Sequence, residues 1–308
     1  MKKIIFFAII ILTQTVNAQI GPFGGGDGYS EATAYEIYTK EHLEELSDSV
    51  ANNPLDIDDI GSHWSKDKYF KLMNNITEPL TEPIGKMFGF PSNDIMFNGF
   101  FDGQNHSIEL LIDSDVGIGC LFVSIGNYAV IKNVILNGYI RGGWVAGMVC
   151  TQTDCSALDT NYVTEISNCI NNAKIVGGGG YTAGFIGAIV YGTIKNCINL
   201  GSIIGRGDTG IEYFECVGGI AGMVTPPYCQ YYNKTGYSMK IIIENCINYG
   251  FIKARDYYLS IYYKSYAGGI VGRNYGADPL FDYTIENCIN TGVIEGPEDY
   301  SDGIIGEK

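Results

Sequence analysis

The chain has 308 residues, with 34 acidic and 19 basic side chains and a formal net charge of −15. A surface this acidic argues against nucleic acid and anionic membranes as partners, while the length is ample for a large hydrophobic core. Glycine is abundant, at 41 residues, and has no collagen-like period, so many tight turns are expected.

The first 18 residues are typical of a secretory signal peptide. Lys2 and Lys3 precede an apolar run over residues 4–12, and small residues lead to a cleavage site after Ala18. The apolar run is too short to span a bilayer. We therefore expect a secreted or cell-surface protein with no membrane span, whose mature chain carries a charge of −15 − 2 = −17 once both lysines are removed.

Residues 19–100 are expected to form a small α/β cap and lead-in segment. Thr39 is placed to cap the N-terminus of a helix over residues 40–51. Three apolar residues fall on one face of this helix: Leu43, Leu46 and Val50. Such an element can shield the first coil of a stacked repeat.

The sequence repeats over residues 101–308. The pattern Ile-x-Asn-Cys-Ile-Asn occurs four times, and a degenerate copy carries Val134 in the cysteine position and Trp144 where later copies have glycine. Each copy precedes a second phrase such as "VGGIAGMV" at 217–224. We predict that each unit forms three short strands, and that about five units stack as the coils of an all-β, parallel β-solenoid.

The repeated asparagines and cysteines have a structural reason in this fold. Asparagine tolerates the left-handed conformation of a solenoid corner, and the corner should turn the following cysteine inward. The corner asparagines are Asn133, Asn168, Asn196, Asn245 and Asn287, and the four later ones should hydrogen-bond from coil to coil. The cysteines are Cys169, Cys197, Cys246 and Cys288. Since stacked residues on parallel strands rarely have disulfide geometry, these thiols should be reduced and packed.

The other five cysteines do not share this phase. They are Cys120, Cys150, Cys155, Cys216 and Cys229. Cys150 could pair with Cys155, and Cys216 with Cys229, but the odd total of nine leaves at least one free thiol. No Cys-x-x-Cys spacing indicates a metal site.

Three stretches resemble the GLUG-repeat family. They are "IENCINTGVIEG" (285–296), "AGGIVGRN" (267–274) and "FNGFFDGQNHSIELLI" (97–112). The family consists of bacterial surface and secreted proteins, and its repeats also occur beside IgA-peptidase-type metalloproteases. The resemblance covers nearly the whole mature chain, although Asn75 stands where the family usually has Asp. It implies a β-solenoid but no particular activity, because the repeat is structural.

Two kinds of enzyme can be weighed from the sequence. A metalloprotease is not expected, because the only histidines are His42, His63 and His106, and no His-Glu-x-x-His motif is present. A polysaccharide-degrading β-helix enzyme is the alternative to a binding protein, with Asp102, His106, Asp113 and Asp115 as its candidate residues. We expect Asp102 and His106 to shape a turn instead.

The acidic stretches "DIDD" (56–59) and "PEDYSD" (297–302) lack the ligand spacing of an EF-hand loop, so we expect solvated loops there and no cofactor. Tyrosines concentrate in two insertions, at 225–240 and 254–266. The candidate ligand-binding residues are Tyr228, Tyr231, Tyr232, Tyr257, Tyr258, Tyr262 and Tyr263, and Tyr237 and Tyr266 also stand in these insertions. Tyrosine offers a large contact area with a polar tip, although some of these rings could pack on their own loops.

The sequence therefore predicts a monomeric, non-catalytic binding or adhesion protein. Its ligand would be a glycan or a host or cell-surface protein.

Overall fold

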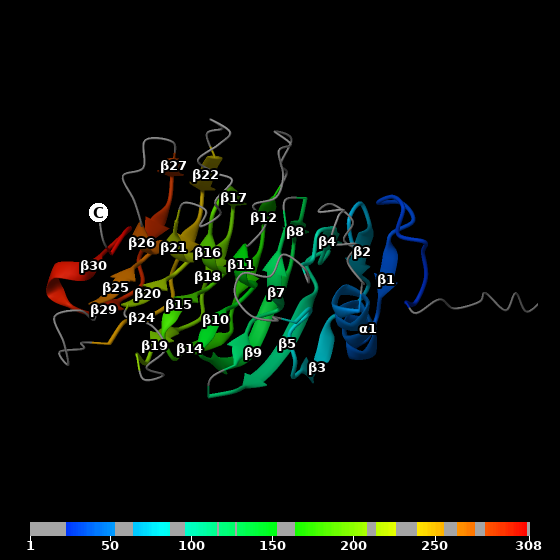
Figure 1. Ribbon diagram of the computed structural model, residues 1–308, viewed down its shortest axis with the longest axis horizontal. Helices are drawn as coiled ribbons and strands as arrows, with labels where there is room; N and C mark the ends of the chain where they lie inside the picture. The colour runs from blue at the N-terminus through cyan, green and yellow to red at the C-terminus, as the bar shows by residue number, and fades with distance from the viewer. Residues whose placement is uncertain are drawn as a thin grey trace, which may run out of the picture.

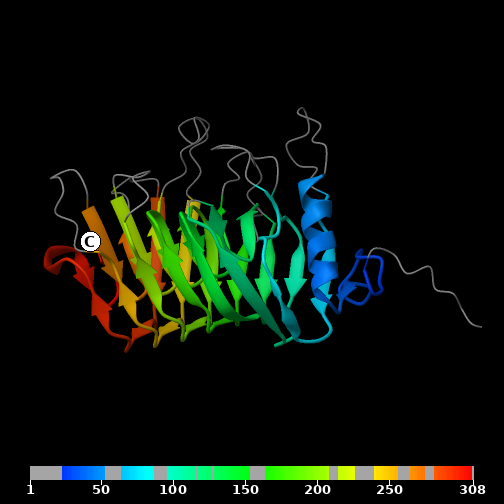
Figure 2. The same cartoon turned by 90° about the horizontal axis from the view of Figure 1, so that it is seen from below.

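The computed structural model describes residues 23–52, 64–86, 96–115, 117–126, 128–152, 164–207, 214–225, 239–255, 264–274 and 281–306. Short parallel strands stack along the long axis of the molecule, from β1 (Tyr35–Ile37) at one end to β30 (Ser301–Asp302) at the other (Figure 1). Figure 2 shows the same stack from below, with helix α1 (Lys40–Ala51) near its N-terminal end. The predicted all-β parallel solenoid is confirmed.

The strands form four sheets, here named A to D. Sheet A contains β1, β2 (Tyr69–Leu72), β4 (Phe100–Asp102), β8 (Val130–Lys132), β12 (Glu165–Ser167), β17 (Gly192–Lys195), β22 (Met239–Glu244) and β27 (Phe281–Glu286). Sheet B contains β3 (Ile76–Leu80), β5 (Ser107–Asp113), β9 (Ile135–Gly142), β13 (Ile170–Asn171), β14 (Lys174–Gly177), β18 (Ile198–Asn199), β19 (Ile203–Gly205), β23 (Ile247–Asn248), β24 (Ile252–Lys253), β28 (Ile289–Asn290) and β29 (Ile294–Glu295). Sheet C contains β7 (Phe122–Ile125), β11 (Val149–Gln152), β16 (Ile186–Ile189), β21 (Ala221–Val224) and β26 (Val271–Asn274). Sheet D contains β6 (Ile118–Gly119), β10 (Trp144–Ala146), β15 (Gly180–Ala183), β20 (Phe214–Gly218), β25 (Lys264–Gly268) and β30, and a short 3₁₀ turn, η1 (Glu298–Tyr300), precedes β30.

A complete coil has more strands than the three predicted. The coil that begins at β17 runs through β18, β19, β20 and β21, because the first and third predicted strands are each divided by a corner. The first corner is Asn196, whose φ of 55° is left-handed. The other contains Gly219, where a Cβ atom would lie 2.2 Å from the carbonyl oxygen of Gly269 in the next coil. Only glycine fits that close approach.

The predicted cysteine column is confirmed. Ile170, Ile198, Ile247 and Ile289 are in register immediately after the four cysteines. Cys169, Cys197 and Cys246 have no exposed surface, and Cys288 in the last coil is half-buried. All four are free thiols.

All five corner asparagines have the predicted left-handed conformation. Each has a φ between 52° and 57°. The Nδ2 group of Asn196 donates to Oδ1 of Asn168 at 3.1 Å, which is one coil-to-coil bond of the predicted kind. In the degenerate copy, Asn133 donates instead to the Asp102 carboxylate at 2.9 Å.

A second asparagine ladder, which the repeat pattern did not predict, lies inside the solenoid. It is made by the last asparagine of each repeat: Asn171, Asn199, Asn248 and Asn290. The Nδ2 groups of Asn171, Asn199 and Asn248 each donate to the Oδ1 atom of the next asparagine at 2.7 Å. The first three side chains are fully buried, so this ladder keeps polar groups satisfied within the core.

The N-terminal segment continues the solenoid. Strands β1, β2 and β4 extend sheet A beyond the first repeat found in the sequence, so the lead-in shares the sheet as well as carrying the helix. The predicted helix and its buried face of Leu43, Leu46 and Val50 are confirmed. Thr39 occupies the N-cap position in an extended conformation, but its side chain makes no capping hydrogen bond. Among the described residues, no helix is long and apolar enough to cross a membrane.

The remaining cysteines are only partly described. Cys120 and Cys150 pack together in a small buried cluster as free thiols. Cys216 is fully buried in sheet D. Cys155 and Cys229, the suggested partners of Cys150 and Cys216, lie outside the described residues.

Candidate functional site

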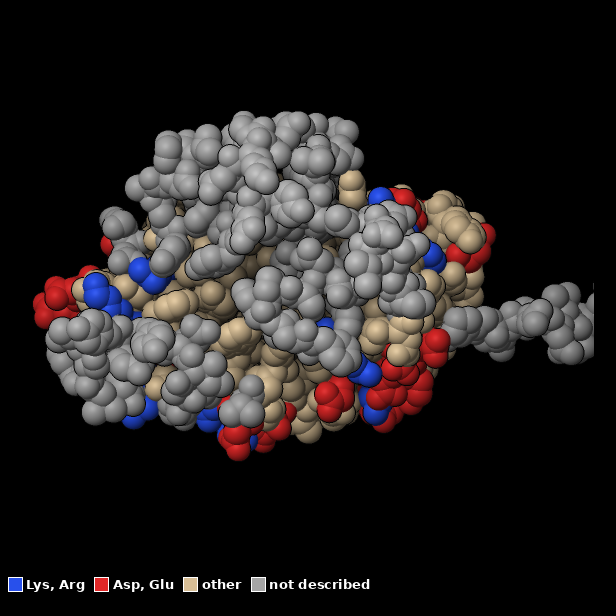
Figure 3. Space-filling view, viewed as in Figure 1, with Lys and Arg blue, Asp and Glu red and all other residues tan. Residues whose placement is uncertain are grey.

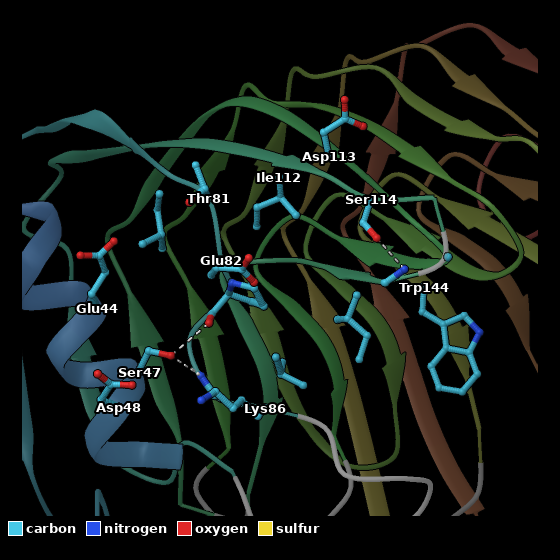
Figure 4. A pocket seen from close by; sticks show the side chains of 17 residues that line it. Glu44, Ser47, Asp48, Thr81, Glu82, Lys86, Ile112, Asp113, Ser114 and Trp144 are labelled. Atoms are coloured by element: carbon cyan, nitrogen blue, oxygen red, sulfur yellow. Dashed lines mark hydrogen bonds between the residues drawn. The ribbon is translucent and has the colours of Figure 1, made fainter. Parts of the chain in front are cut away.

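A groove of about 1060 Å³ lies between helix α1 and the N-terminal coils (Figure 4). Four segments that are distant in the sequence line it. They are one side of α1 around residues 44–48, the segment 80–86, the coil of β5 to β7 (residues 112–114, 117, 118 and 123), and residues 143–144 at the start of β10. Solenoid stacking brings these segments together, because each belongs to a different coil or to the helix.

The floor of the groove is apolar. Leu80, Ile112 and Val123 line it and are otherwise almost fully buried. Trp144 stands at one edge, and its partly buried ring packs against the cluster of Cys120, Val123 and Cys150. An aromatic ring beside an apolar floor is a surface on which the flat, apolar side of a sugar ring can lie.

The rim of the groove is acidic. The carboxylates that line it belong to Glu44, Asp48, Glu82 and Asp113, and Lys86 is the basic residue in the lining. Carboxylates accept hydrogen bonds and attract cations, so this rim suits hydroxyl and ammonium groups and disfavours sulfate, phosphate and uronate. On the face in Figure 3, acidic side chains also gather at the lower rim of this N-terminal end.

One rim carboxylate is held by an ion pair. The Arg141 guanidinium on β9 donates to both Asp113 and Asp115, and these contacts raise the pKa of Arg141, with the Asp113 hydrogen bond as the main cause. Asp113 and Asp115, two candidate residues of the enzyme alternative, therefore lie together at the end of β5. They bind a fixed cation there, and only Asp113 lines the groove.

Hydrogen bonds to helix α1 hold the opposite wall of the groove in place. The Ser47 hydroxyl donates to the carbonyl of Pro83 and accepts a hydrogen bond from the Gly85 amide, both at 3.1 Å (Figure 4). At the far side, the Gly117 amide donates to Ser114 Oγ at 2.8 Å and closes the turn after β5. Both walls are therefore fixed by local hydrogen bonds, so the groove is preorganised.

The structure gives Asp102 the turn-forming role that the sequence suggested, whereas the His106 side chain contacts a residue of the neighbouring coil. The Asp102 carboxylate accepts hydrogen bonds from the Gln104 amide and Asn133 Nδ2, both at 2.9 Å, and pairs with Lys132 at 3.3 Å. His106 Nδ1 lies 3.3 Å from Asn75 Oδ1. Neither residue lines the groove.

The predicted tyrosine site cannot be compared with this groove. Tyr228, Tyr231, Tyr232, Tyr237, Tyr257, Tyr258, Tyr262 and Tyr263 all lie outside the described residues, as does the 56–59 acidic stretch. Tyr266 is described: it is buried in β25, and the Arg273 guanidinium lies 4.5 Å from the centre of its ring. Tyr266 is therefore a packing residue. The sequence offered one local sign of the groove, namely that Trp144 stands where later repeats have glycine.

The comparisons with known proteins concern the fold. The chain matches no protein-family model and no curated protein. Its structure is similar to a crystal structure described as that of "a putative immunoglobulin A1 protease from Bacteroides ovatus", with a TM-score of 0.62 and 20% sequence identity. The match covers 93% of this chain and 78% of that protein. At this identity the shared property is the parallel β-solenoid fold.

Proposed function

We propose that this chain is a secreted or cell-surface binding protein without catalytic activity, and that it holds an extracellular glycan in the groove beside α1. The observation that carries the proposal is the groove's combination of Trp144, an apolar floor and an acidic rim. These features suit a neutral or amino-sugar glycan, because the rim favours hydroxyl and ammonium groups. The signal peptide predicted from the sequence supports an extracellular location.

The repeat resemblance and the solved structure support the solenoid fold on which this proposal rests. We place the chain among GLUG-type repeat proteins on the sequence motifs, and its fold neighbour is described as an immunoglobulin A1 protease candidate. A protease activity is not proposed here, because the sequence has no His-Glu-x-x-His motif. A solenoid that presents a rigid groove can bind a ligand without chemistry of its own.

A glycan array probed with residues 19–308 tests the proposal. We expect binding to neutral or amino-sugar glycans, little binding to sulfated or uronic-acid glycans, and no release of sugar products. Trp144→Ala should weaken binding at least tenfold, whereas Tyr29→Ala, which removes a 78% exposed ring outside the groove, should have no effect.

Because Trp144 also packs on a buried cluster, a second variant is needed. Glu82→Gln keeps the size of an exposed rim residue and removes its charge, so it should weaken binding of amino-sugar ligands while the fold persists. Unchanged binding in both variants would contradict the assignment of the groove as the binding site. Turnover of a polysaccharide would support the enzyme alternative. Binding to a surface protein only would replace the glycan with the other ligand class.

A further inference from the structure

The outer face of sheet B is apolar and exposed. Of the six large hydrophobic residues with high exposure in the described part of the chain, five lie on it: Leu111, Leu200, Tyr249, Ile289 and Val293. A column of aligned isoleucines runs beside them: Ile135, Ile170, Ile198, Ile247 and Ile289. Alternate residues on the same strands, such as Asn199 and Ile203, have no exposed surface, so the isoleucines point outward. An exposed apolar patch of this extent usually marks an interaction site.

This face carries a net charge of only −1, although the chain is strongly acidic. Its acidic residues are Glu78, Glu109, Asp113 and Glu295, and its basic residues are Arg141, Lys174 and Lys253, so that 3 − 4 = −1. The whole chain has a charge of −15. Two acidic copies can therefore approach each other through this face without the repulsion that the overall charge produces.

The size of the face also suits a pair of copies. Five stacked coils at a strand spacing of about 4.8 Å, with about seven residues per strand, cover roughly 500 Å². Burying this area on both copies gives about 1,000 Å², the lower limit of a stable and specific interface. The expected complex is therefore a dimer of moderate affinity.

The charges favour one register for a two-fold face-to-face pair over those shifted toward the N-terminus. With the two-fold axis parallel to the strands, each column faces the same column of the other copy in reverse coil order. If the axis passes through the β18–β19 coil, Arg141 faces Glu295 and Lys174 faces Phe251 of the second copy. The first contact joins two existing ion-pair groups, Arg141 with Asp113 and Asp115 in one copy and Lys253 with Glu295 in the other, and the second is a cation–π contact. A shift of half a coil toward the N-terminus would place Asp113 against Glu295, and a shift of a full coil would place Lys174 against Lys174.

The same register matches the apolar residues. Ile289 faces Ile135, and Ile247 faces Ile170, while Ile198 and Leu200 lie on the axis and face their own copies. Val293 faces Tyr139 at the edge of the contact. We propose that the outer face of sheet B is the interface of a symmetric dimer, in which the two solenoids run in opposite directions with their groove-bearing ends apart.

Sedimentation equilibrium of residues 19–308 at about 1–100 µM tests the dimer. We expect a monomer–dimer equilibrium. Leu200→Asp places two carboxylates on the two-fold axis and should raise the dissociation constant at least tenfold. The matched control is Tyr29→Asp, an equally polar change at an exposed ring off this face, and it should leave the constant unchanged.

Chemical cross-linking tests the register. Sheets that pack face to face are about 10 Å apart, which is too far for a disulfide but within reach of a short bismaleimide. Leu200→Cys should yield a covalent dimer with this reagent beyond any wild-type background, whereas Thr193→Cys on the outside of sheet A should not. A wild-type protein that is monomeric at 100 µM, or a Leu200→Cys variant that is not cross-linked, would overturn the proposal.

Discussion

Asn199 donates from Nδ2 to Oδ1 of Asn248 at 2.7 Å, in the interior of the solenoid and across two coils that are 49 residues apart in the sequence. The same Nδ2 group donates to the carbonyl of Gly201 at 3.0 Å, and Oδ1 of Asn199 accepts from Asn171 at 2.7 Å. The side chain thus uses both donors and its acceptor while fully buried. Each coil is joined to the next through this chain of amides as well as through the backbone.

Asn199→Ala should lower the free energy of unfolding by about 2–4 kcal/mol, because it leaves the amide of Asn171 and the Oδ1 atom of Asn248 buried with one partner fewer. Denaturant unfolding measures the change. The control is Asn172→Ala, which removes an exposed coil-to-coil bond of 2.9 Å to Asn137 and should cost less than about 0.5 kcal/mol. Equal effects of the two substitutions would show that the interior ladder adds no stability of its own.

The two ladders show what the sequence could and could not predict. The corner at Asn196 could be predicted from the sequence. A left-handed conformation restricts the residue type at that one position, and asparagine occupies it in each repeat. The cysteine column follows from that corner. Asn199 repeats just as regularly. However, an asparagine at the end of a strand is also typical of an ordinary turn, and only the observed register shows that this side chain points into the core.

The groove was less predictable for a different reason. Glu44, Glu82, Asp113 and Trp144 share no motif or spacing, and their proximity depends on where helix α1 rests against the coils. The repeat pattern also predicts fewer strands per coil than the structure has. The corner at Gly219 depends on the close approach of a neighbouring backbone, which no local sequence pattern reveals.

The cysteine column makes a prediction about tolerance to substitution. Cys197 Sγ lies 3.4 Å from the carbonyl oxygen of Lys195, so a serine hydroxyl would find an acceptor in the same place. Cys197→Ser should therefore lower the free energy of unfolding by only about 1 kcal/mol, which is less than the burial of an unpaired hydroxyl would lower it. Cys197→Val should be similarly mild, because Val134 fills the equivalent position of the earlier coil.

Thermal unfolding of both variants measures these costs. Cys197→Asp serves as the disruptive control, since it would bury a charge among thiols and isoleucines. Mass mapping of the oxidised wild-type protein completes the test: a disulfide between any two of Cys169, Cys197, Cys246 and Cys288 would contradict the reduced column.

Glu215 on β20 gives the stability a dependence on pH. Its side chain is only 3% exposed and accepts a hydrogen bond from the Arg255 amide at 3.0 Å. Burial raises the pKa of Glu215 from 4.5 to about 7, against the opposing effects of hydrogen bonds and of Arg255. Below pH 4.5 the carboxyl group is protonated in both the folded and unfolded states. As the pH rises from 4.5 to 7, the unfolded state loses this proton first, so Glu215 lowers the stability progressively.

Glu215→Gln should remove this loss, which is of the order of 3 kcal/mol for a shift of this size. Denaturation curves between pH 4.5 and 8 measure it, as the difference between wild type and variant. The difference should be small at pH 4.5 and should grow in favour of the variant up to about pH 7. A constant difference across the range would mean that the pKa of Glu215 is similar in the folded and unfolded states.

The tyrosine insertions remain a separate binding prediction. Interfaces concentrate their energy in a few aromatic residues, and Tyr258 and Tyr262 stand in the denser of the two insertions. If these rings contact the ligand, Tyr258→Ala with Tyr262→Ala should weaken glycan binding at least tenfold while the circular dichroism of the solenoid is retained. If the groove alone binds the ligand, the double variant should bind like wild type and only Trp144→Ala and Glu82→Gln should weaken binding. Isothermal titration of all these variants with one glycan from the array distinguishes the two sites. Weaker binding in both the tyrosine variant and the groove variants would indicate a ligand long enough to contact the groove and the insertions together.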